Sequence, residues 1–176
     1  MGAESRSNDD ARITLVLGGA RSGKSRYAET LIGRFPDPLY LATAEAGDAE
    51  MSARIALHRK RRGSSWRTVE EPLELAQTLE RHADTPVLVD CLTLWLSNLM
   101  MAGRDPNRES ERLIAALGRA SAPVALVSNE VGLGIVPETP LGRRFRDEAG
   151  RLNQAVAAAA DRVVFMAAGL PMVLKA

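Results

Sequence analysis

The sequence predicts an α/β fold in which a mainly parallel β-sheet lies between two layers of helices. Three observations support this prediction. Short apolar runs alternate with segments of helical spacing along the chain, which is typical of parallel strands joined by helical crossovers. A glycine-rich turn follows the first apolar run. Several later runs end in a polar side chain, at the sheet edge where such folds bind their ligands.

The glycine-rich turn is GGARSGKS, which fits the pattern G-x-x-x-x-G-K-[ST] of a phosphate-binding P-loop. Its glycines let backbone N–H groups close around phosphate oxygens. In this pattern Lys24 reaches the β- and γ-phosphates, and the Ser25 hydroxyl binds Mg²⁺. The alternative interpretation is a glycine-rich turn that binds no ligand. Such a turn would give this Lys-Ser pair no role. We therefore expect a P-loop NTPase of the RecA-like type, with nucleotide bound by Gly18, Gly19, Ala20, Arg21, Ser22, Gly23, Lys24 and Ser25.

The remaining strands and helices are predicted from the same two signals, short apolar runs for strands and helical spacing of apolar residues for helices. Strands are predicted at 13–17, 38–44, 66–70, 87–90, 123–130, 162–169 and 171–175. Helices are predicted after the P-loop to about residue 35, then at 50–62, from Pro72 to about 83, and at 93–100, 111–120 and 143–160. Residues 103–107 form a polar turn and 132–142 a loop rich in Gly and Pro. The last strand is expected to be an antiparallel edge strand.

Length and composition predict one domain at residues 12–176, preceded by a disordered tail at 1–11. No apolar stretch is long enough to span a membrane, and the polar N-terminus lacks the apolar core of a signal peptide. The single cysteine, Cys91, lies in an apolar run and is expected to be a buried thiol. These features predict a cytoplasmic protein. A net charge of +1 and 4% aromatic residues argue against a nucleic-acid-binding face.

Four predicted strands end in candidate ligand-binding residues. Asp90 ends VLVD, an apolar run closed by an acid, where the carboxylate would hold Mg²⁺ directly or through water. Alternatively, Asp90 caps the helix that follows. The side chains at the other strand ends could line the pocket or satisfy backbone groups, and the pattern leaves both options open for Thr43, Glu70, Asn129 and Glu130. Glu71 is a better-placed helix cap than Glu70.

His58 stands in the basic segment ARIALHRKRR, where Arg54 and residues 59–62 lie within one helical turn of it. This cationic field makes protonation of the imidazole harder, and a neutral imidazole beside a polyphosphate is a competent nucleophile toward phosphorus. On pattern alone, however, a solvated basic helix that includes a histidine is favoured. The other histidine, His82, lies at a predicted helix end, where a surface role is expected.

Four segments together resemble the family of bifunctional adenosylcobinamide kinases/adenosylcobinamide-phosphate guanylyltransferases. They are GGARSGKSRYAE, EMSARIALHRKRR with WRTVE, VLVDCLTLWLSNL, and SNEVGLGIVPETPLGRRFRDEAGRLNQ. The resemblance extends from about Ile13 to Lys175, and ordinary P-loop kinases lack the last two segments. It implies that ATP or GTP phosphorylates the aminopropanol hydroxyl of adenosylcobinamide, and that GMP is then transferred from GTP to the resulting phosphate.

The resemblance also implies residue roles. His58, in the family's R-I-x-x-H stretch, attacks the α-phosphorus of GTP and carries GMP as a phosphoramidate, which overturns the solvated-helix interpretation. Nucleotide contacts are implied for Ala42, Thr43, Ala44, Arg59, Lys60, Arg61, Arg62, Glu70 and Asp90. Family members carry Glu or Asp at this last position, and the shorter Asp leaves open whether it contacts Mg²⁺ directly.

The family is further expected to form a homotrimer with the corrinoid bound between subunits. Arg143, Arg144 and Arg146 could then reach a neighbouring site or simply form a solvated helix face. The helix that carries His58 must swing toward the P-loop for guanylyl transfer, so Gly47 and Gly63 are hinge candidates.

Two other functions compete with the bifunctional enzyme. One is a simple small-molecule kinase in which His58 is inert. The other is a nucleotide-dependent switch or assembly module that hydrolyses ATP without an acceptor. A partner-binding tail or internal repeats would favour such a module, and the sequence contains neither.

Overall fold

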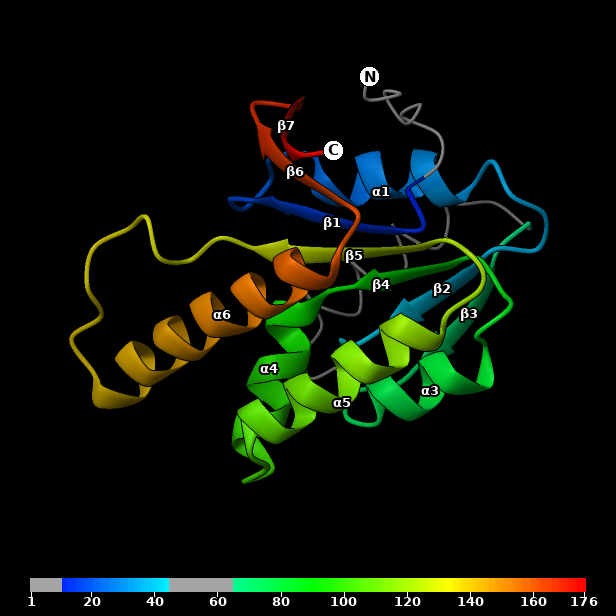
Figure 1. Ribbon diagram of the computed structural model, residues 1–176. Coiled ribbons are helices and arrows are strands. Elements are labelled where there is room, and N and C mark those ends of the chain that lie inside the picture. The colour runs from blue at the N-terminus through cyan, green and yellow to red at the C-terminus, as the bar shows by residue number, and fades with distance from the viewer. Residues whose placement is uncertain (1–10, 45–64) are drawn as a thin grey trace, which may run out of the picture.

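The computed structural model describes residues 11–44 and 65–176, and within them the predicted parallel sheet is confirmed. The seven strands of this part of the chain have the order β3-β2-β4-β5-β1-β6-β7 (Figure 1). Neighbouring strands are parallel except β6 and β7, which are antiparallel as expected for the last strand. The strands are β1 Ile13–Gly18, β2 Leu39–Ala42, β3 Arg67–Glu70, β4 Val87–Asp90, β5 Val124–Asn129, β6 Arg162–Ala167 and β7 Leu170–Lys175.

Helices cover both faces of the sheet, as the alternating pattern predicted (Figure 1). On one face lies α1, Lys24–Ile32. The opposite face is covered by α3 Leu75–Arg81, α4 Leu92–Met101, α5 Pro106–Arg119 and α6 Pro140–Ala159. The helix predicted at 50–62, which contains His58, lies outside the described residues. The two hinge candidates that flank it, Gly47 and Gly63, lie outside them as well. No helix of the described part is long and apolar enough for a transmembrane segment.

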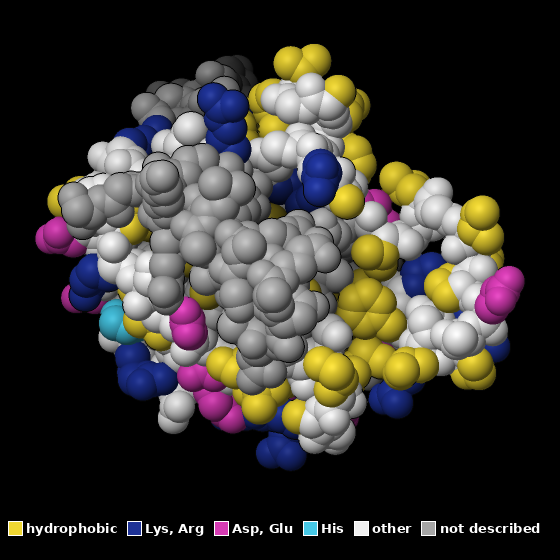
Figure 2. Space-filling model, turned by 180° about the vertical axis from the view of Figure 1, so that it is seen from behind, with side chains coloured by type: hydrophobic (Ala, Val, Ile, Leu, Met, Phe, Trp, Pro, Cys, Tyr) yellow, Lys and Arg dark blue, Asp and Glu magenta, His cyan; other side chains and the backbone are white. Residues whose placement is uncertain are grey.

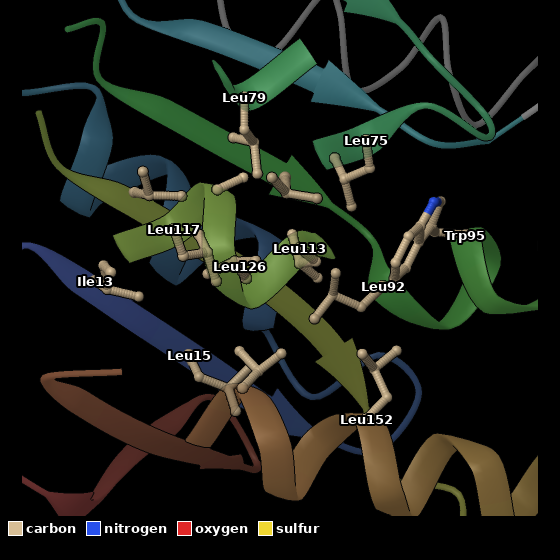
Figure 3. Packing of buried hydrophobic residues seen from close by; sticks show 14 of the residues in the cluster. Ile13, Leu15, Leu75, Leu79, Leu92, Trp95, Leu113, Leu117, Leu126 and Leu152 are labelled. Atoms are coloured by element: carbon tan, nitrogen blue, oxygen red, sulfur yellow. The ribbon is translucent and has the colours of Figure 1, made fainter. Parts of the chain in front are cut away.

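The core consists of two apolar layers, one on each face of the sheet. The larger layer packs α3, α4, α5 and α6 against the strands, with Leu15, Leu113 and Leu126 fully buried (Figure 3). Trp95 is only 1% exposed there, and its indole N–H donates to the Leu73 carbonyl at 2.9 Å. The smaller layer lies under α1. Because both faces are covered, strands such as β1 are buried along their whole length, which explains their unbroken apolar sequences.

Two helices begin earlier than the sequence predicted. Helix α5 starts at Pro106, inside the stretch 103–107 that was expected to be a turn, and α6 starts three residues early at Pro140. In each case a side chain accepts a hydrogen bond from a first-turn N–H group: the Asp105 carboxylate at 2.9 Å and the Thr139 hydroxyl at 3.1 Å. A capping residue followed by proline fixes a helix start more strongly than the onset of apolar spacing.

Helix α3 begins at Leu75, later than the expected start near Pro72. The carboxylate of Glu71 accepts hydrogen bonds from the N–H groups of Leu73 at 3.1 Å and Glu74 at 2.8 Å. These bonds hold the turn that leads into α3. The N-cap position of α3 belongs to Glu74, which has no side-chain cap, so Glu71 stabilises the turn before the helix and is not the helix cap that the sequence predicted.

Candidate functional site

The P-loop leaves β1 at Gly18 and enters α1 at Lys24. Its backbone takes positive φ angles at Gly18 (148°), Arg21 (56°) and Gly23 (98°), so the loop turns sharply at the predicted glycines. Gly23 is the N-cap residue of α1, and no side chain caps this helix start. The N–H groups of the first turn are therefore left for an anion, with the helix dipole favouring negative charge there.

Lys24 is 6% exposed, and its Nζ donates to the Gly19 carbonyl at 2.5 Å. Burial lowers the pKa of Lys24 below its ordinary value, while the charges of Cys91 and Asp90 act in the opposite direction. The ammonium is held at the loop itself, where a polyphosphate would meet it.

Asp90 ends β4, which is separated from the P-loop strand by β5 alone. Among the described residues, no α4 backbone N–H donates to Asp90, and the N-cap position of α4 belongs to Cys91 without a side-chain cap. The helix-cap alternative for Asp90 thus has no support. The Tyr40 hydroxyl donates to Asp90 Oδ2 at 2.7 Å. This contact depends on strand register and could not be predicted from a local motif.

Thr43 is fully buried, and its hydroxyl serves the backbone of the neighbouring strand end. It donates to the Cys91 carbonyl at 2.7 Å and accepts from the Cys91 N–H at 2.9 Å. Thr43 therefore ties the end of β2 to the junction of β4 and α4. Cys91 is 5% exposed, as predicted for a buried thiol, and burial raises its pKa to about 11.

Asn129 ends β5 beside Gly18 in the sheet register. Its N–H donates to the Thr93 hydroxyl at 2.7 Å, and its carbonyl accepts from the Asn153 side chain at 3.4 Å. Its own side-chain amide lies 4.0 Å from the Cys91 sulfur. Helices α4 and α6 thus fix the backbone of Asn129, and its carboxamide lies on the side of the strand where Asp90 ends β4.

The two glutamates at strand ends differ in placement. The Glu130 carboxylate accepts from the Gly132 N–H at 2.6 Å, and the Glu130 N–H donates to the Gly18 carbonyl at 3.0 Å. Glu130 therefore stabilises the start of the loop from β5 to α6. Glu70 ends the edge strand β3, where it pairs with Ala42, and Ala42 in turn pairs with Asp90 on β4. Four predicted strand-end sites therefore lie along one carboxyl edge.

The basic residues are only partly placed. His58 and residues 59–62 lie outside the described part of the chain. In α6, Arg143 donates to the carbonyls of Pro137 at 3.1 Å and Glu138 at 2.6 Å, and Arg146 pairs with Asp147 at 3.3 Å. Arg143 therefore connects the loop from β5 to α6 with the first turn of α6.

The turn between β6 and β7 packs against the P-loop, a contact that the sequence did not reveal. The Gly169 N–H donates to the Ser22 carbonyl at 3.1 Å. A Cβ atom on Gly18 would come within 2.5 Å of the Met166 carbonyl oxygen, and one on Gly23 within 3.4 Å of the Gly169 Cα. The hydroxyl of Ser22 is buried, with no hydrogen-bond partner in the described residues. The C-terminal hairpin of β6 and β7 thus packs against the P-loop and stabilises its conformation.

The residues at this edge fit a magnesium ion bound together with a nucleotide. The described residues contain no cluster of three or more His, Cys, Asp or Glu side chains suited to a metal ion. Ser25 near the start of α1 and Asp90 at the end of β4 supply oxygen atoms only. Mg²⁺ prefers oxygen ligands, and in kinases it is held by one or two protein groups together with phosphate oxygens and water.

A sequence profile described as cobinamide kinase/cobinamide phosphate guanyltransferase matches residues 14–174. This chain belongs to that family. This family member is 55% identical to the bifunctional adenosylcobalamin biosynthesis protein CobP of Pseudomonas aeruginosa, over 92% of this chain and 96% of that protein. It is 46% identical to the bifunctional adenosylcobalamin biosynthesis protein CobU of Salmonella typhimurium, over 93% of this chain and 99% of that protein. The resemblance predicted from the four segments is confirmed.

Solved structures of low sequence identity share the fold. The P4 protein of bacteriophage phi6, determined with ADP, matches with a TM-score of 0.50 and 18% identity, over 92% of this chain and 52% of that one. The protein PH0250 of Pyrococcus horikoshii matches with a TM-score of 0.56 and 9% identity, over 94% and 86% of the two chains. These matches show that the fold of this family member occurs in chains that share little of its sequence.

Proposed function

We propose that this protein phosphorylates adenosylcobinamide with ATP or GTP and then transfers GMP from GTP to adenosylcobinamide phosphate. The match to the cobinamide kinase/cobinamide phosphate guanyltransferase family along residues 14–174 carries this proposal. The P-loop, with its buried Lys24 at an uncapped helix start, supplies the nucleotide-binding chemistry that both reactions need. Both reactions use a nucleoside triphosphate, so we place them in the cytoplasm.

In the kinase step, the backbone N–H groups of Gly18 to Ser25 and the Lys24 ammonium neutralise charge on the β- and γ-phosphates. Ser25 and Asp90 would hold Mg²⁺, which when bound supplies further charge neutralisation on the phosphates. The corrinoid hydroxyl attacks the γ-phosphorus and the bond to the β-phosphate oxygen breaks. The protein contributes positioning and electrostatics, and it forms no covalent bond in this step.

In the guanylyl step, a nitrogen of the His58 imidazole attacks the α-phosphorus of GTP and pyrophosphate leaves. An oxygen of adenosylcobinamide phosphate then attacks the same phosphorus, and the P–N bond breaks to give adenosylcobinamide-GDP. We further propose nucleotide contacts from residues 42–44 and 59–62 and from Glu70. The Thr43 hydroxyl already bonds the Cys91 backbone, and its main-chain N–H donates to the Asp90 carbonyl at 3.2 Å, so its contact with the nucleotide would be van der Waals packing.

The His58 step is tested by incubating the enzyme with GTP labelled at the α-phosphate. We expect acid-labile, alkali-stable label on the wild-type protein and none on His58→Asn, because an asparagine amide offers no nucleophilic nitrogen to form the phosphoramidate. His82→Asn removes the chain's other histidine and should keep the label. His58→Asn should also retain conversion of adenosylcobinamide to its phosphate. Label on His58→Asn removes His58 from the mechanism, and unlabelled wild type with kinase activity supports the simple-kinase alternative.

We also propose a homotrimer with the corrinoid bound between subunits. Two apolar surfaces support an assembly: the outer strand β7 and the loop from β5 to α6, both visible as yellow side chains in Figure 2. Their exposed apolar residues are Leu133, Ile135, Val136, Leu170, Met172, Val173 and Leu174, and the exposed Leu141 follows the loop in the first turn of α6. We assign no contacts in this assembly to Arg144 or to its basic neighbours in α6.

Sedimentation equilibrium should show the mass of three chains for the wild type. Leu174→Glu, on β7, should shift the protein toward single chains, because a charge would be buried in the interface. Met101→Glu alters a side chain that is 76% exposed at the end of α4, outside both surfaces, and should leave the mass unchanged. A wild-type protein that sediments as one chain contradicts the trimer.

A further inference from the structure

Tyr40 lies in the middle of β2 on the face that α1 covers, and it is 6% exposed. Its ring meets Trp66 edge-on, with centroids 6.3 Å apart and planes at 78°. In the register of β2 and β4, Tyr40 pairs with Leu88, and Ala42 pairs with Asp90. Tyr40 and Asp90 are therefore diagonal neighbours on one face of the sheet, a separation that a long aromatic side chain spans.

The Tyr40 hydroxyl reaches across this diagonal and donates to Asp90 Oδ2 at 2.7 Å. Among the described residues this is the one hydrogen bond that the Asp90 carboxylate accepts, since the Thr43 N–H donates to the main-chain carbonyl of Asp90. The terminal torsion of an aspartate side chain is broad, so an unheld carboxylate samples many orientations. A charge-assisted bond to one oxygen fixes that torsion and leaves Oδ1 for a ligand.

We propose that Tyr40 is a positioning residue that orients the Asp90 carboxylate toward the magnesium ion of the bound nucleotide. This inference rests on the proposed function, in which Asp90 and Ser25 hold that ion. Tyr40 itself does not touch the nucleotide in this proposal. It acts by keeping Asp90 in one orientation before the nucleotide arrives, so that binding does not have to order the carboxylate.

A purely structural role for the hydroxyl predicts something different. A buried phenol needs a hydrogen-bond partner, and Asp90 could serve merely as that partner. In Tyr40→Phe the ring keeps its place against Trp66, so the packing survives and only the hydroxyl is lost. A structural role would then lower stability and leave the metal dependence of nucleotide binding unchanged. A positioning role changes that dependence.

The measured quantity is the affinity for a fluorescent, non-hydrolysable GTP analogue, with Mg²⁺ and with EDTA. We expect Mg²⁺ to tighten binding to the wild type. In Tyr40→Phe this tightening should shrink about five- to tenfold, the loss expected for one typical hydrogen bond. Affinity in EDTA should stay within about twofold, because the P-loop is unchanged. Tyr27→Phe removes the chain's other phenol, from α1 of the same apolar layer, and should keep the full tightening.

A double-mutant cycle completes the test. In an Asp90→Ala background the tightening by Mg²⁺ should be small, and adding Tyr40→Phe should change it no further, because the hydroxyl acts only through the carboxylate. Thermal unfolding of each variant confirms that the fold is intact. Full tightening in Tyr40→Phe, or an equal loss of affinity in EDTA and in Mg²⁺, overturns the role of Tyr40 while the proposed function stands. If Mg²⁺ does not change the affinity of the wild type for the nucleotide, both the role of Tyr40 and the proposed function are overturned.

Discussion

Lys24→Ala should abolish both proposed reactions, with each rate falling by about 10²- to 10³-fold, the loss typical when one preorganised charge-stabilising donor is removed. The ammonium is buried at the P-loop, where its Nζ donates to the Gly19 carbonyl. Nucleotide affinity should fall as well, because the same ammonium neutralises the phosphates before the reaction. Steady-state rates of each reaction and equilibrium titration with the fluorescent nucleotide measure these losses.

Lys175→Ala is the matched control. Lys175 also donates from Nζ to backbone carbonyls, those of Ala157 and Ala158 at the end of α6, but it ends β7 and is exposed. Its removal should leave nucleotide affinity within about twofold of the wild type, since a surface lysine contributes little. If Lys24→Ala binds nucleotide as tightly as Lys175→Ala does, the P-loop is not the triphosphate site.

The strands and the P-loop were predictable because their determinants are local. Strand β1 is buried on both faces, so its sequence is apolar without interruption, and the glycine pattern that follows it requires no knowledge of the rest of the fold. The carboxyl edge was predictable as well, because parallel strands place their ends together. Asp90 could be selected there as the acid that closes an apolar run.

Contacts between distant segments were not predictable from the sequence. The hydrogen bond from Tyr40 to Asp90 depends on the register between β2 and β4, and the strand order itself had no local signal. The turn at Gly169 that packs on the P-loop lies in a hairpin that was expected only as an edge. For His58 neither periodicity nor spacing separated a catalytic residue from a solvated one. Its role came from the family resemblance alone.

Gly18→Ala should destabilise the protein by about 3–5 kcal/mol, which places it among the most harmful single substitutions. The new Cβ would lie 2.5 Å from the Met166 carbonyl oxygen and 2.7 Å from the Ser22 hydroxyl oxygen. The first of these is backbone in the neighbouring strand β6, so it cannot move without breaking the sheet. The φ angle of 148° at Gly18 adds strain for any L-residue. Urea unfolding monitored by circular dichroism gives the free energy of unfolding.

Gly19→Ala tests whether this loss comes from the close approach of β6 or from any added methyl group in the loop. A Cβ on Gly19 meets no heavy atom within 4 Å, and its φ angle is not in the left-handed region. Its free energy of unfolding should therefore stay within about 1 kcal/mol of the wild type, as for substitutions away from packed sites. Equal losses in the two variants would mean that the hairpin does not hold the P-loop in place. A large loss in Gly18→Ala alone means that the C-terminal hairpin and the nucleotide-binding turn form one packed unit.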